Sequence, residues 1–156
     1  MDKKTIIVII FILSIFLTSC GFKKINSDNS LIYLQNIEVI GENRIAYILK
    51  NNLRLISNEN ANKKYNLEVN VEKNKSSKIK NKAGKITRYQ INISARLILK
   101  DSINNTVIDK NFSQSGDYEI AKMHSETISN EKKILKEITQ ELSDEIGTFI
   151  MLSFKN

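Results

Sequence analysis

Residues 65–72 read YNLEVNVE and residues 89–99 read YQINISARLIL, and in both stretches apolar and polar side chains alternate. A period of two predicts a β-strand with one buried face and one solvated face. A third stretch, TVIDKNFSQSGDY at residues 106–118, is less regular, and we expect its strand to end near Ser115 or Gly116. Because short polar connections join the later strands, the sequence predicts an antiparallel meander.

The segments on either side of the meander complete the predicted fold. Residues 31–40 (LIYLQNIEVI) are rich in strand-forming side chains and are followed by a glycine. The side chains expected on one face of this strand are Leu31, Tyr33, Ile37 and Val39. Residues 44–56 and 125–153 carry apolar side chains at spacings of three and four, which is the period of a helix with one buried stripe. The predicted order is therefore β-α-β-β-β-α.

This order predicts an α+β fold. A strand that reaches the next strand through a helix lies parallel to it, so the four-stranded sheet should be mixed. Each helix has a single apolar stripe and each strand a single apolar face. We therefore expect a two-layer sandwich with both helices packed on one face of the sheet.

The first 19 residues have the three parts of a secretion signal. Lys3 and Lys4 supply a positive region, and residues 5–17 (TIIVIIFILSIFL) form an apolar core. That core is too short to span a membrane as a helix, which takes about 20 apolar residues. Residues 17–20 (LTSC) then resemble the lipobox of bacterial lipoproteins. We expect a signal peptide over residues 1–19; the alternative is an uncleaved N-terminal anchor.

Cys20 is the expected site of lipid attachment. Its thiol would carry a diacylglycerol and its freed amine an acyl chain such as palmitate; no other cofactor is predicted. Two or three acyl chains make a lasting anchor. Residues 20–30 are then a lipidated tether to a single domain over residues 31–154. Gly21 stands where lipoproteins retained in the inner membrane usually carry Asp, so we expect an outer-membrane location.

Net charge points to an anionic partner. The chain carries a net charge of +7, and removal of the leader, with two lysines and one aspartate, leaves +6 on 137 residues. A basic balance suits phosphate-bearing lipid or nucleic acid, and export argues against nucleic acid. The alternative is a lysine-, asparagine- and isoleucine-rich genome that produces this charge without selection.

The basic residues are concentrated in residues 73–88 (KNKSSKIKNKAGKITR), which hold seven cations and no acid. We expect this stretch to be the connection between the first two strands of the meander. Charge-assisted contacts with glycolipid phosphates would suit it, and the alternative is a flexible, solvated loop. The candidate binding residues are Lys78, Lys80, Lys82, Lys85 and Arg88.

The sequence does not predict an enzyme. The single histidine, His124, lies at a predicted loop-to-helix junction with no cluster of cysteines or carboxylates beside it, so it suits a surface residue better than a ligand. No nucleophile-elbow, phosphate-loop or zinc-protease motif is present. Glu141 and Glu145 lie one turn apart on the polar side of a helix, where solvation explains them. We predict no catalytic residues and no metal site.

The chain resembles the lipopolysaccharide-assembly lipoprotein family LptE. The similarity includes Cys20-Gly21-Phe22, the Arg-led helix RIAYILKNNL at 44–53, and Tyr118 before the last helix. Further matching residues are Thr87, Arg88, Ala95, Leu97, Leu99, Lys100 and Asp101. Family members usually carry a glycine in the turn after the position of Asp101, where this chain has Asn104-Asn105.

The resemblance implies a fold and a role. The fold is a sheet with two helices on one face. The role is that of a non-enzymatic plug of the outer-membrane barrel LptD that assists lipopolysaccharide assembly, with the domain on the periplasmic side or within the barrel lumen. The implied partners are an LptD-like barrel and lipopolysaccharide. The alternative is an auxiliary lipoprotein of an envelope lipid-transport ABC system.

Overall fold

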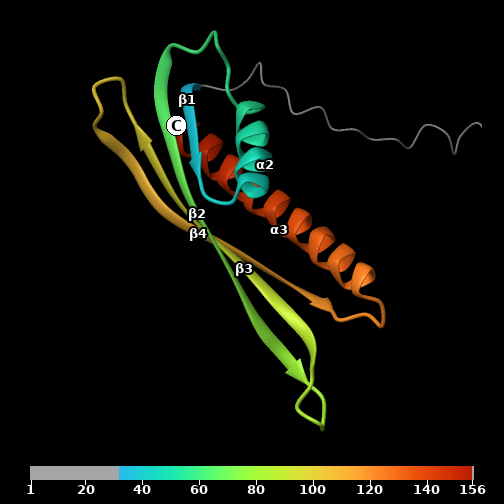
Figure 1. Cartoon of the computed structure of the whole chain (residues 1–156). Coiled ribbons are helices and arrows are strands. Elements are labelled where there is room, and N and C mark those ends of the chain that lie inside the picture. Colours follow the sequence, from blue (N-terminus) through green and yellow to red (C-terminus); the bar gives the residue numbers. More distant parts are fainter. Residues whose placement is uncertain (1–31, 156) are drawn as a thin grey trace, which may run out of the picture.

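The computed structural model describes residues 32–155, so the predicted signal peptide, Cys20 and the tether lie outside the described residues. The described elements follow the predicted order (Figure 1). They are β1 (Ile32–Ile40), α2 (Asn43–Arg54), β2 (Lys63–Lys80), β3 (Ile86–Lys100), β4 (Thr106–Glu119) and α3 (His124–Ser153).

The strands form one mixed sheet in the order β1-β2-β3-β4. β1 runs parallel to β2, whereas β2 and β3, and β3 and β4, pair antiparallel. Both helices lie on the same side of the sheet (Figure 1). The α+β class, the mixed sheet and the two-layer arrangement are therefore confirmed.

The core lies between the helices and the inner face of the sheet. Ile45, Leu49 and Leu53 of α2 are fully buried, at the spacing that the sequence predicted. The stripe of α3 is buried through Ile150, but its first member, Ile128, is 39% exposed because α3 begins beyond the core. α2 ends at Arg54, earlier than expected, yet Ile56 in the following turn remains buried.

The face of β1 differs from the prediction. Ile32 and Leu34 are buried, whereas Tyr33 is only partly buried. A β-bulge between Leu34 and Asn36 inserts one residue and reverses the alternation, so Ile37 again faces the core. The predicted assignment of Tyr33 to the face of Ile37 was therefore wrong; Leu31 lies outside the described residues.

The basic stretch is mostly β-strand and not a loop, which corrects the prediction. β2 continues to Lys80 and β3 begins at Ile86, so only residues 81–85 form the turn. Cross-strand pairing with β3 holds the distal part of β2 in a strand, although no residue beyond Val71 is buried there. The distal part of β2 is therefore a strand because its backbone pairs with β3, although its side chains do not alternate between apolar and polar.

β4 also extends further than predicted. It ends at Glu119, past Ser115 and Gly116, because Tyr118 is buried against α3 and pairs with Tyr89 of β3. In the turn before β4, Asn104 has φ of +64°. Asparagine is among the few residues other than glycine that adopt this left-handed conformation readily.

Candidate functional site

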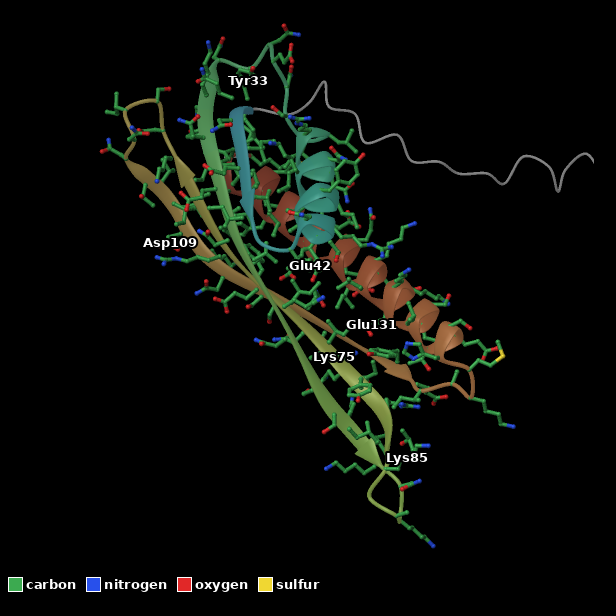
Figure 2. The ribbon with its side chains drawn as sticks, in the orientation of Figure 1. Tyr33, Glu42, Lys75, Lys85, Asp109 and Glu131 are labelled. Atoms are coloured by element: carbon green, nitrogen blue, oxygen red, sulfur yellow. The ribbon has the colours of Figure 1, made fainter. Side chains whose placement is uncertain are left out.

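The candidate site is the hairpin formed by residues 73–88, here called the basic hairpin. Asn81 organises its turn, since its Oδ1 accepts hydrogen bonds from the backbone N–H groups of Ala83 (3.0 Å) and Lys85 (2.9 Å). Gly84 has φ of +77°, which glycine adopts without steric cost. The turn therefore presents Lys82 and Lys85 on a defined, exposed tip, where Figure 2 labels Lys85.

Two cations of the basic hairpin are neutralised on the sheet face that lacks helices. Lys78 forms an ion pair with Asp117, and Arg88 forms one with Glu119. Both acids belong to β4. These predicted binding residues therefore hold β4 against the hairpin, and their charges are largely cancelled locally.

Two further cations are neutralised on the helix side. Lys73 pairs with Glu42, the residue before α2. The Lys75 ammonium donates to Glu131 of α3 at 2.8 Å, and the two side chains point toward each other in Figure 2. The Tyr118 hydroxyl donates to the same carboxylate at 2.8 Å.

Aromatic rings complete the cluster around Lys75. Its Nζ lies 4.6 Å from the ring centroid of Tyr89 and 5.2 Å from that of Tyr118. Burial opposes the charge on both Lys75 and Glu131, but their mutual hydrogen bond, the hydrogen bonds with Tyr118 and their mutual attraction together outweigh it. The pKa of Lys75 is therefore raised and the pKa of Glu131 lowered. Burial raises the pKa of Tyr118.

Three lysines at the distal end remain uncompensated. Within the part of the chain that the structure describes, Lys80, Lys82 and Lys85 form no ion pair, and all three are exposed. Ile79 beside them is 44% exposed. The tip therefore combines three free ammonium groups with an apolar side chain, a combination that suits an anionic amphiphile.

The five predicted site residues thus divide into two groups. Lys80, Lys82 and Lys85 stay together as free cations, whereas Lys78 and Arg88 are engaged with β4. Sequence reasoning missed the neutralising acids because they lie 31 to 56 residues away in the chain. The strand expected over 106–118 was also predicted to end near Ser115 or Gly116, before Asp117 and Glu119.

Other candidate chemistry is sparse. Within residues 32–155, no group of three or more histidine, cysteine, aspartate or glutamate side chains could hold a metal ion. His124 is the exposed first residue of α3. Over the same residues, none of the helices has the length and apolarity needed to cross a membrane.

No protein-family model matches the chain, and no curated protein sequence matches it. Solved structures do match. Rare lipoprotein B from Shewanella oneidensis superposes with a TM-score of 0.60 at 13% identity, covering 76% of this chain and 93% of that one. The chain has the LptE-like fold.

Two further structures with the LptE-like fold agree. A minor lipoprotein from Acinetobacter baumannii gives a TM-score of 0.58 at 15% identity, over 80% of this chain and 92% of that one. A lipoprotein from Caulobacter crescentus gives 0.53 at 16% identity, over 74% and 88% of the two chains. The fold expected from the resemblance is confirmed, and the similarity extends over nearly the whole length of each neighbour.

Proposed function

We propose that the protein is an outer-membrane lipoprotein, anchored through lipid on Cys20, that assists lipopolysaccharide assembly without covalent chemistry as the partner of an LptD-like barrel. The LptE-like fold supports the class of protein. The lipobox-like LTSC at residues 17–20 supports the anchor.

The observation that carries the proposal is the distal end of the basic hairpin. Lys80, Lys82 and Lys85 are exposed and uncompensated among the described residues, and the exposed Ile79 directly precedes Lys80 in β2. Lipopolysaccharide presents phosphates above acyl chains. Ammonium groups meet phosphates as charge-assisted contacts, and an isoleucine can bury its side chain at the acyl boundary.

The experiment compares binding of lipopolysaccharide micelles by the wild type and by the triple variant Lys80→Gln, Lys82→Gln, Lys85→Gln at low salt. Each lysine near an anionic surface contributes about 1 kcal/mol, so the variant should bind roughly 100-fold more weakly. The difference should shrink at physiological salt, where screening acts within about 8 Å.

A matched control removes three exposed lysines elsewhere: Lys132→Gln, Lys136→Gln and Lys155→Gln. This control has the same net charge as the test variant and should keep most of the affinity. Equal losses in the two variants would assign the binding to bulk charge and refute a role for the hairpin tip. Circular dichroism should show the same fold in both.

A further inference from the structure

The two edge strands of the sheet, β1 and β4, differ in whether their outward backbone groups have hydrogen-bond partners. At the β1 edge, the Leu34 N–H donates to the Ser57 hydroxyl at 2.9 Å, and the Ile32 carbonyl accepts from the Asn58 N–H at 3.1 Å. A bulge follows at Gln35. Bulges and covering segments are the usual means by which proteins close an edge strand, so the first half of the β1 edge is closed.

The β4 edge is open over most of its length. Beyond the ladder with β3, the Ile120 N–H donates to the Thr87 carbonyl at 3.0 Å. Bonded and outward-pointing residues alternate in an antiparallel pair, and the β3–β4 register is regular from Glu119 back to Ile108. The odd-numbered residues 109–117 therefore turn their N–H and C=O groups away from β3. Among the described residues, no strand pairs with that side of β4.

A groove accompanies this open edge on the helix side. It is shallow and widely open to solvent, has a volume of about 430 Å³, and lies between β4 and the last turns of α3. Phe112 and Phe149 form its aromatic wall, with ring centroids 5.5 Å apart, and Leu152 is 59% exposed beside them. The Lys110 ammonium lies over the Phe149 ring, 3.8 Å from its centroid. In this position it leaves the outward backbone groups of β4 uncovered.

The groove changes character along the strand. Two residues beyond Phe112, Gln114 donates its amide to Glu145 of α3 at 3.1 Å. Glu145 lines the groove together with Asp144, the residue before it. One end of the groove is therefore aromatic and the other acidic, although the chain as a whole is basic.

We propose that the β4 edge binds an extended segment of another protein as a fifth, antiparallel strand. Its backbone would pair with the outward groups of residues 109–117. An apolar side chain would lie against Phe112 and Phe149, and a basic side chain two residues earlier would face Glu145. Strand addition of this kind takes affinity from the main chain and specificity from alternate side chains.

A second copy of this chain fits the edge poorly. α3 packs directly beneath β4, as the contacts of Glu131, Ile138 and Phe149 with β4 residues show. Paired strands lie about 4.8 Å apart, whereas packed helices need 8–10 Å. Two copies joined through β4 would press their α3 helices together, and a lone strand carries no such helix.

The test uses the full chain, purified from membranes in detergent, and the peptide Ser-Thr-Ser-Lys-Thr-Leu-Ser-Thr-Ser. The control peptide exchanges the lysine and the leucine. The first peptide should bind about tenfold more tightly, and binding should slow amide hydrogen exchange at Asn111, Ser113 and Ser115. The amides of Phe112 and Gln114 already bond to β3 and should change little.

Ser113→Pro removes an outward N–H without breaking the ladder with β3, since proline is tolerated on the open side of an edge strand. We expect about tenfold weaker peptide binding than in the matched variant Ser113→Ala. Equal binding by the two variants, or protection elsewhere on the surface, would overturn the proposal. Failure of the peptide to bind would also overturn it, as would a dimer that Ser113→Pro converts to monomer.

Discussion

Lys75 joins the basic hairpin to α3 through Glu131. Replacing Glu131 with Gln removes the attraction and leaves a partly exposed ammonium beside two stacked tyrosine rings. Because the pair is partly solvated, we expect the free energy of unfolding to fall by about 0.5–1 kcal/mol. Urea denaturation of the wild type and Glu131→Gln measures the difference. An unchanged free energy of unfolding would show that the ion pair does not stabilise the fold.

The same pair predicts a pH dependence. The pKa of Glu131 is lowered from 4.5, so its contribution is present above that value and is lost as pH falls through the folded pKa. The pKa of Lys75 is raised from 10.5, so its contribution is present below that value and is lost as pH rises through the folded pKa. The stability difference between wild type and Glu131→Gln should therefore be largest between these limits.

Gly116 lets α3 approach β4 closely. A Cβ at this position would lie 2.7 Å from Cγ2 of Ile134 and 2.8 Å from Cγ2 of Ile138. These methyl groups are attached directly at the β-carbon and cannot swing aside, so Gly116→Ala should destabilise the protein by about 1–3 kcal/mol. Thermal or urea unfolding checks this value, and a neutral result would mean that α3 shifts freely on the sheet.

Gly147 lies inside α3 and, in contrast to Gly116, has room for a larger side chain. A Cβ there would lie 3.7 Å from Cγ2 of Ile56, which is ordinary contact. Glycine in a helix interior costs about 0.5–1 kcal/mol relative to alanine. Gly147→Ala should therefore raise the midpoint of thermal unfolding, and a lowered midpoint would contradict the space between α3 and Ile56.

Elements with strong periodicity were predictable from the sequence. The alternation in 65–72 and 89–99 located β2 and β3, and the three-and-four spacing located both helices. The bulge in β1 was not predictable, because Gln35 carries no bulge signal. The distal half of β2 was also missed, because its polar, lysine-rich side chains show no apolar alternation and only its pairing with β3 makes it a strand.

At the scale of the whole molecule, sequence reasoning found the basic hairpin but overestimated its free charge. Counting within residues 73–88 gave seven cations. The fold brings Glu42, Asp117, Glu119 and Glu131 to four of them. Compensation of this kind depends on strand order and on the position of α3, so it becomes visible only once the chain is folded.

The predicted anchor has its own test. Cys20→Ala removes the thiol that would accept the diacylglyceryl group. We expect the variant to keep its leader or to leave the membrane fraction, because an acylated chain end is the anchor. Mass spectrometry and membrane fractionation measure both properties, with the wild type as the reference. Unchanged processing and unchanged membrane association would refute lipid attachment at Cys20.

The most direct test of the proposed function is crosslinking of the wild-type chain in intact outer membranes, followed by purification and identification of the crosslinked protein. We predict a large outer-membrane barrel protein in stoichiometric yield, with crosslinks from the folded domain. Recovery of an inner-membrane transporter instead, or of the chain alone from membranes in which it is abundant, would contradict the proposed role in lipopolysaccharide assembly.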